Sequence, residues 1–178
     1  MNKKENNFFL ELNYSINNLQ YKELNNLVLE IKKISKNKRR IFFLGIGGSA
    51  GNASHAVNDF RKICNIECYA PTDNVSELTA RTNDEGFNTI FSEYLKCSKL
   101  TKNDAIFIFS VGGGNLKLRV SVNLIEAIKF ANKKKAKIFS IVGKNNGYAY
   151  KNSDVSIYID VKNKKYTTPI SEAMQGVI

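Results

Sequence analysis

Two glycine-rich segments have the composition of an anion site. They are Gly45–Ser49 and Ser110–Asn115, and each follows a short apolar run. Glycines allow backbone N–H groups to approach an anion closely, and a helix that begins at the turn adds a favourable dipole. Serine and asparagine side chains supply further donors. One segment of this kind is weak evidence, because tight turns and close helix–strand packing also use glycines, whereas two together predict a cradle for a phosphate group at the ends of two strands.

A nucleotide site is the competing interpretation of the first segment. Gly45, Gly47 and Ala50 nearly match the dinucleotide-binding fingerprint. However, no acidic residue ends the next strand about 20 residues further on, where a ribose hydroxyl would need it. The chain also lacks the Gly-x-x-x-x-Gly-Lys-Ser/Thr pattern of a P-loop. The segment therefore indicates a phosphate group without a nucleotide.

His55, the one histidine of the chain, is followed by Asp59 four residues later. Residues four apart share a helix face, so the imidazole and the carboxylate are expected to project together near the first glycine segment. Such a pair suits a metal ion or an acid–base dyad that acts on a carbonyl group. A solvated helix face with an accidental pair explains the spacing equally well.

Apolar periodicity along the chain alternates between helix and strand. Residues 5–36 carry apolar positions at spacings of three and four with a break near Gln20, which predicts one bent helix or two. Short continuous apolar runs predict buried strands. The alternation predicts a parallel sheet covered on both faces, in one domain over 1–178. The expected strands are 40–44, 105–109, 137–142, 155–161 and, more weakly, 66–69; the expected later helices are 52–63, 77–81, 88–98, 116–132 and 169–178.

Composition excludes several function classes. The formal net charge is +11, but the basic residues are scattered over helix ends and turns without interleaved aromatic side chains, so no nucleic-acid partner is expected. No apolar run has the length of a membrane span, and the polar N-terminus is not a signal peptide, so we expect no membrane and a cytoplasmic location. Cys64, Cys68 and Cys97 form no Cys-x-x-Cys pair, which predicts plain thiols.

Four segments together resemble the sugar-isomerase (SIS) domain family and, more narrowly, the bacterial phosphoheptose isomerases. They are Gly45-x-Gly-Gly-Ser49, His55-Ala-Val-Asn-Asp59, Asn83-Asp84-x-Gly86-Phe87 and Phe109-Ser110-x-Gly-Gly. The resemblance implies a three-layer α/β/α fold with a five-stranded parallel sheet in flavodoxin-like order, preceded by N-terminal helices. It also implies a homotetramer with sites at subunit interfaces. We expect the helical segment 1–36 to take part in its assembly.

The resemblance implies an aldose–ketose isomerase that interconverts sedoheptulose 7-phosphate and a D-glycero-heptose 7-phosphate through an enediol, often with zinc. Catalytic and zinc-binding roles carry over to His55, Asp59 and Glu172. The competing hypothesis is a non-catalytic SIS protein that senses a phosphosugar or binds a protein partner, because fold alone does not decide function. The substrate-binding positions that carry over are Gly47, Gly48, Ser49, Asn83, Asp84, Ser110, Val111, Gly112 and Asn115.

Three positions depart from the family pattern. The second glycine segment has fewer hydroxyl groups than the Ser-Thr-Ser-Gly-Asn-Ser that is usual in the family, and Asp59 stands where a glutamate is usual. The family's last helix carries a histidine two turns after the position of Glu172, and the chain stops at Ile178, before that histidine. We therefore expect a truncated form with weak zinc binding.

Overall fold

Residues 3–178 are described by a computed structural model, in which five parallel strands form one sheet in the order β2-β1-β3-β4-β5. All four neighbouring pairs are parallel, as strands joined by helical crossovers must be. This confirms the predicted fold class and the flavodoxin-like strand order. The strands are β1 (Ile41–Leu44), β2 (Cys68–Tyr69), β3 (Ala105–Ser110), β4 (Lys137–Val142) and β5 (Val155–Tyr158).

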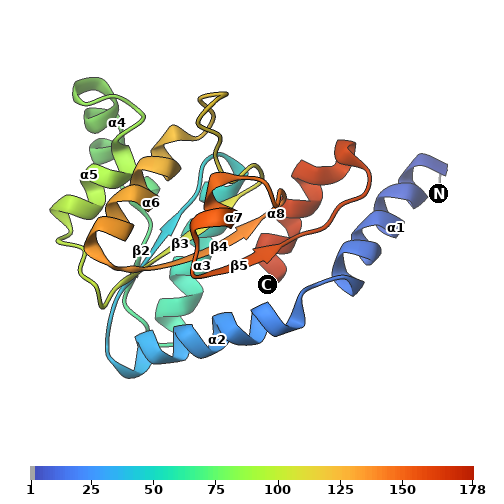
Figure 1. The fold of residues 1–178 in the computed structure, drawn as a ribbon, viewed down its shortest axis with the longest axis horizontal. Helices are drawn as coiled ribbons and strands as arrows, with labels where there is room; N and C mark the ends of the chain where they lie inside the picture. Colours follow the sequence, from blue (N-terminus) through green and yellow to red (C-terminus); the bar gives the residue numbers. More distant parts are fainter. Residues whose placement is uncertain (1–2) are drawn as a thin grey trace.

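Helices cover both faces of the sheet (Figure 1). One face carries α1 (Lys3–Asn17), α2 (Tyr21–Lys36), α3 (Gly48–Lys62) and α8 (Thr167–Val177). The other face carries α5 (Ile90–Cys97), α6 (Val122–Lys134) and α7 (Tyr148–Asn152). Helix α4 (Val75–Asp84) buries none of its residues, and the short 3-10 turns are Pro71–Asp73 and Lys164–Tyr166. No helix within residues 3–178 is long and apolar enough to cross a membrane.

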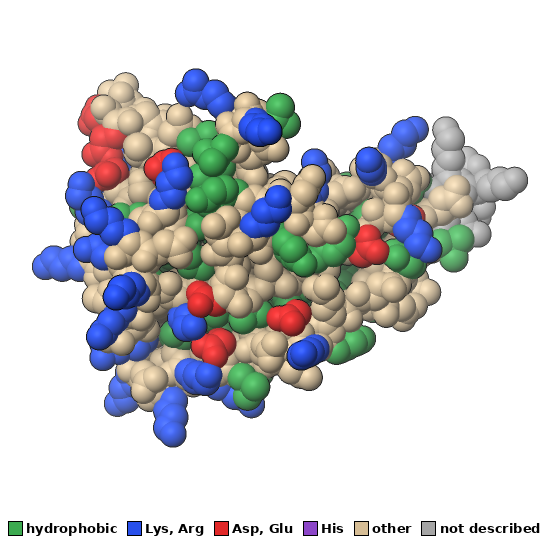
Figure 2. All heavy atoms as spheres, viewed as in Figure 1, with side chains coloured by type: hydrophobic (Ala, Val, Ile, Leu, Met, Phe, Trp, Pro, Cys, Tyr) green, Lys and Arg blue, Asp and Glu red, His purple; other side chains and the backbone are tan. Residues whose placement is uncertain are grey.

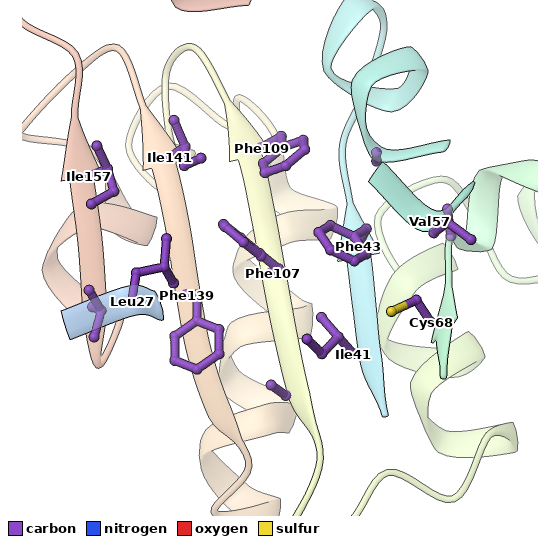
Figure 3. Packing of buried hydrophobic residues seen from close by; sticks show 14 of the residues in the cluster. Leu27, Ile41, Phe43, Val57, Cys68, Phe107, Phe109, Phe139, Ile141 and Ile157 are labelled. Carbon is purple, nitrogen blue, oxygen red and sulfur yellow. The ribbon is translucent and has the colours of Figure 1, made fainter. Parts of the chain in front are cut away.

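The two faces divide the apolar residues of each strand by alternation. Phe43, Phe107 and Phe109 point to the face of α2 and α3, where Figure 3 shows them in a row of aromatic rings. Their strand neighbours Phe42 and Ile108 point to the face of α5 and α6. Because successive side chains of a strand point to opposite faces, a continuous apolar run fills two separate cores.

Arg40 and Asp104 join β1 to β3 at the end of the sheet where both strands begin. The two side chains form an ion pair with an Arg40 Nη2 to Asp104 Oδ2 distance of 2.8 Å, and Thr101 donates a further hydrogen bond to the same carboxylate. Burial alone would raise the pKa of Asp104, but these hydrogen bonds outweigh it and hold the pKa below its ordinary value. The pair therefore holds the two strands in register from their first residues.

Several boundaries differ from the sequence prediction: α3 begins at Gly48 and not at 52, and α4 spans Val75–Asp84 and not 77–81. Helix α6 begins at Val122 and not near 116, because Asn115 and Val120 pair with one another and Ser121 adopts a left-handed conformation with φ of 50°. Strand β5 ends at Tyr158, before the predicted 161. The break near Gln20 and the bounds of β4 are confirmed, whereas α7 was not predicted.

Helix α1 is docked at one edge of the molecule (Figure 1). The Tyr14 hydroxyl donates to Asp160 at 2.8 Å, and the Ser15 hydroxyl donates to the Asp160 carbonyl at 2.6 Å. Phe8 packs edge-on against Tyr166, while Phe9 is 56% exposed. Figure 2 shows Lys and Arg side chains spread over several elements of the face it draws, in agreement with the scatter of basic residues along the sequence.

Candidate functional site

The two glycine turns lie side by side because β1 and β3 are neighbours in the sheet. Leu44, the last residue of β1, is in register with Ile108 of β3. The chain leaves β1 into α3 on one face and leaves β3 toward α6 on the other face. In open α/β sheets such a switch in crossover direction creates the crevice in which ligands bind. Both predicted phosphate segments therefore border one crevice.

The first turn ends at the N-terminus of α3. Gly47 precedes the helix with φ of 62° and ψ of −129°, a conformation that disfavours any side chain, and a methyl group at Gly45 would collide with the Ser49 carbonyl oxygen. The N–H groups of Gly48 and Ser49 lie in the first turn, where helix residues have no intrahelical acceptor. Gly47, Gly48 and Ser49 therefore present donors and a positive helix end, as the sequence predicted.

A carboxylate already lies at this helix end. Glu172, on α8, is packed so closely on Gly48 that a methyl group at position 48 would lie 2.6 Å from its Cδ and Oε1 atoms. A negative charge is favourable near a helix N-terminus. The sequence predicted a shared site for Glu172, His55 and Asp59, and the structure puts Glu172 at the glycine turn and not beside His55.

One face of α3 faces α8 along its length. Gly48, Asn52, His55 and Asp59 follow one another at helical spacings of four, three and four. The Asn52 amide donates to the Glu172 carbonyl oxygen at 2.8 Å and to Gln175 Oε1 at 3.1 Å. His55 Nε2 lies 3.2 Å from Asp59 Oδ2, so the predicted pair is formed.

The structure does not gather His55, Asp59 and Glu172 into one metal site. His55 follows Gly48 by seven residues on α3. The backbone of His55 therefore lies about 10 Å along the helix axis from Gly48, where Glu172 makes its contact. In the described part of the chain no group of three His, Cys, Asp or Glu side chains could hold a metal ion. The His55 and Asp59 side chains are also 72% and 41% exposed. The residues of one chain therefore do not fit a zinc site with three protein ligands.

His55 and Asp59 border a mostly apolar hollow of about 460 Å³ between α2, α3 and the last residues of α8. Gln175 contributes a polar side chain to the lining of this hollow. Its Oε1 atom accepts from Asn52, while its Nε2 atom is buried and has no hydrogen-bond partner within residues 3–178. The hollow therefore offers one buried donor next to the His55–Asp59 pair.

The second turn uses its own hydroxyl group to hold its shape. Ser110 Oγ accepts a hydrogen bond from the Gly113 N–H at 3.0 Å. Gly113 and Gly114 have φ of 68° and 83°, which explains why glycine occupies both positions. In the described chain the N–H groups of Gly112 and Gly114 have no acceptor, and a methyl group at Gly112 would meet open space. Ser110, Val111 and Gly112 thus form an open turn with free donors.

Asn115 ends the second turn, whereas the predicted substrate residues Asn83 and Asp84 lie away from both turns. The Asn115 carboxamide oxygen accepts from the Leu118 N–H at 3.0 Å, so it is used within the loop that precedes α6. Asn83 and Asp84 end α4, where they are exposed and bonded to one another at 2.7 Å. Among the described residues no hydrogen bond joins Asn83 or Asp84 to either turn.

A polar hollow beside the second turn was missed from the sequence. It has a volume of about 400 Å³ and lies against Val111 of the second turn and the first residues of α8. Gly143 and Lys144 follow directly after β4. The sequence signal for this hollow was therefore a third apolar run that ends at a glycine. The hollow is lined by Val111, Gly143, Lys144, Asn145, Asn146, Tyr158, Val161, Lys164, Thr167 and Thr168.

Comparison with known proteins places the chain among sugar-phosphate enzymes, although no family model matches it. It is 31% identical to a phosphoheptose isomerase of Buchnera aphidicola over 83% of this chain and 74% of that protein. It is 30% identical to the lincomycin biosynthesis protein LmbN of Streptomyces lincolnensis, of which the match covers 50%. The phosphoheptose isomerase structure from Neisseria gonorrhoeae superimposes with a TM-score of 0.76 at 22% identity, over 98% of this chain and 95% of that one.

We predict that Gly48→Ala displaces Glu172, because the new methyl group would lie within 2.8 Å of the whole carboxylate group. Overpacking of this kind destabilises a protein by about 1–3 kcal/mol, which urea denaturation measures. The double variant Gly48→Ala, Glu172→Ala should recover most of this loss. Gly51→Ala is the matched control, since its methyl group meets open space in the same helix and should stabilise it by up to about 1 kcal/mol. Equal effects of the Gly48 and Gly51 variants would contradict the contact.

Proposed function

Because the chain belongs to the phosphoheptose isomerase family, we propose that it interconverts sedoheptulose 7-phosphate and a D-glycero-heptose 7-phosphate. The observation that carries this proposal is the Glu172 carboxylate at the first of two adjacent glycine turns. A base at one turn and free N–H donors at the other are what an open-chain phosphosugar needs. The non-catalytic alternative is not favoured, since the relatives with the highest coverage are named isomerases.

Charge decides which end of the sugar lies at which turn. A phosphate at Gly48 would meet the Glu172 carboxylate, and two like charges in a crevice repel one another. The second turn offers the free Gly112 N–H group, and the hollow beside it is lined by two lysines. We therefore assign the phosphate to the second turn and the carbonyl end of the sugar to the first.

The chemistry requires one proton to move between two neighbouring carbons. Glu172 would take the proton from the carbon next to the carbonyl group while the carbonyl oxygen gains a proton, which gives the enediol. The same carboxyl group then returns the proton to the former carbonyl carbon, and the hydroxyl proton leaves the other oxygen. Holding the phosphate fixes the reacting carbons against the carboxylate, which removes much of the entropic cost.

His55 is the proposed proton donor to the carbonyl oxygen, and Asp59 is its proposed partner in catalysis. Side chains of a helix lean toward its N-terminus, so the His55 imidazole leans from its place on α3 toward the first turn. Asp59, 3.2 Å away, orients the ring. Asn83 and Asp84 stay proposed partners of sugar hydroxyls, as exposed side chains at the end of α4. A cytoplasmic location also stays a prediction, which cell fractionation tests.

We predict that Glu172→Gln lowers kcat on sedoheptulose 7-phosphate by a factor of about 10²–10⁴, the usual contribution of a general base, with little change in KM. Glu126→Gln, on the exposed side of α6, should leave both constants unchanged. Measurement of the interconversion by the native chain and both variants is the test. A native chain that binds the phosphosugar without turnover would sink the isomerase and favour the sensor.

We predict weak zinc binding, because two donors from α3 are fewer than the three protein ligands that a catalytic zinc site normally has. Equilibrium dialysis with zinc should show an affinity that falls further in His55→Ala. The Cys97→Ser variant controls for adventitious binding to an exposed thiol. Tight zinc binding by the native chain, at one ion per chain and lost in His55→Ala, would contradict the prediction and require ligands from a second chain.

We further propose a homo-oligomer, most simply a tetramer, that is assembled through the N-terminal helices. Phe9 and Leu10 on α1 are 56% and 59% exposed, and Leu29 on α2 is also 56% exposed. Burying apolar side chains of this size is the main driving force of subunit association. Phe9→Ser with Leu10→Ser should shift the sedimentation coefficient toward the monomer. A native chain that sediments as a monomer at micromolar concentration would contradict the proposal.

A further inference from the structure

The polar hollow beside the second turn has the composition of an anion site. Lys144 and Lys164 line it from different elements, the first from the residues after β4 and the second from the 3-10 turn before α8. In the described chain neither lysine has an ion-pair partner among the salt bridges. Two unpaired cations that converge on one hollow of about 400 Å³ repel one another unless an anion lies between them.

The other polar side chains that line the hollow are neutral, and each can donate a hydrogen bond. Thr167 and Thr168 open α8, whose N-terminus has no side-chain cap, and Asn145 and Asn146 add amide groups. No acidic side chain of the described residues lines the hollow. Asp160 stands outside this lining, and its carboxylate already accepts hydrogen bonds from Tyr14 and Tyr158. The charged side chains that line the hollow are therefore both positive, while the first turn carries Glu172.

A buried hydroxyl group behind the hollow also lacks a partner. Ser171 is fully buried, and its Oγ atom has no hydrogen-bond partner within residues 3–178. This atom lies directly against Gly143, which forms part of the wall of the hollow. A buried polar group without a partner is costly. A ligand or an ordered water in the hollow would lie close to the Ser171 Oγ atom.

We propose that Lys144 and Lys164 bind the phosphate group of the substrate and so determine specificity for phosphorylated sugars. This assignment rests on the proposed function for the identity of the sugar, but the ligand chemistry, a phosphate dianion, follows from the hollow itself. Val111 belongs to both the second turn and the hollow, so the turn borders the space that the two lysines line. Lysine is a flexible point charge, which suits an anion that turns between free N–H groups.

The test compares each lysine with a neighbour of the same charge outside the hollow. Lys164→Gln is paired with Lys165→Gln, and Lys144→Gln with Lys151→Gln; all four lysines are exposed, so the variants should fold. Inorganic phosphate is the probe, and the midpoint of thermal unfolding is measured against its concentration. We expect the two hollow variants to weaken phosphate binding about tenfold, and the two controls to match the native chain, since a charge-assisted hydrogen bond contributes roughly that factor.

Turnover of sedoheptulose 7-phosphate by the same variants gives the second measurement. A role in binding predicts a KM about tenfold higher with an unchanged kcat, and a native KM that rises with ionic strength more steeply than in the variants. Phosphate binding and KM that are the same in the hollow variants and in their controls would overturn the proposal. If the native chain has no isomerase activity yet Lys164→Gln still weakens phosphate binding, the proposed function fails and the anion site stands.

Discussion

The parallel pairing of β1 with β3 is the constraint on which the site depends. Arg40 and Asp104 join the strands where they begin, and the register continues to Leu44 and Ile108. Two strands held in this way must end at the same edge of the sheet, so their turns border one crevice. A slip of one residue would move one turn past the other and would send the side chains of each core to the opposite face of the sheet. The ion pair at one end of the sheet therefore supports binding at the other.

A second constraint is the close approach of α8 to α3. Gly48 lacks a side chain where Glu172 packs against the helix, and Asn52 then ties α3 to the backbone of α8. These contacts place a carboxylate at the positive end of α3 without an ion-pair partner from Lys or Arg in the described chain. A carboxylate held by helix geometry rather than by a cation stays available as a base.

The elements were predictable from the sequence where local pattern decides them. Continuous apolar runs predicted β3 and β4 because both strands are buried on both faces, and glycine endings predicted their turns. The start of α6 was predicted too early, at 116, and the apolar residues Leu116, Leu118 and Val120 that precede the helix are exposed. The Asn115 side chain bonds within its loop and Ser121 turns left-handed, so local hydrogen bonding prevailed over apolar spacing.

The site was predictable only in those parts that lie close together in sequence. His55 and Asp59 meet because four residues make one helical turn, and each glycine turn is a contiguous segment. The position of Glu172 relative to these groups depends on how α8 packs on α3. No local sequence pattern predicts this packing. The same holds for Lys144 and Lys164, which come together only when the end of β4 meets the start of α8.

Opposite charges at the two turns explain more of the site than either turn does alone. Two glycine turns of similar composition could each accept a phosphate, so the sequence left the direction of the sugar open. Glu172 makes the first turn unfavourable for a dianion, and the two lysines make the second turn favourable for one. In the proposed reaction the substrate is bound in one direction, with its carbonyl end at the carboxylate. The charge proposed to exclude phosphate from the first turn is then the same charge proposed to remove the proton, so both binding direction and catalysis would rest on one side chain.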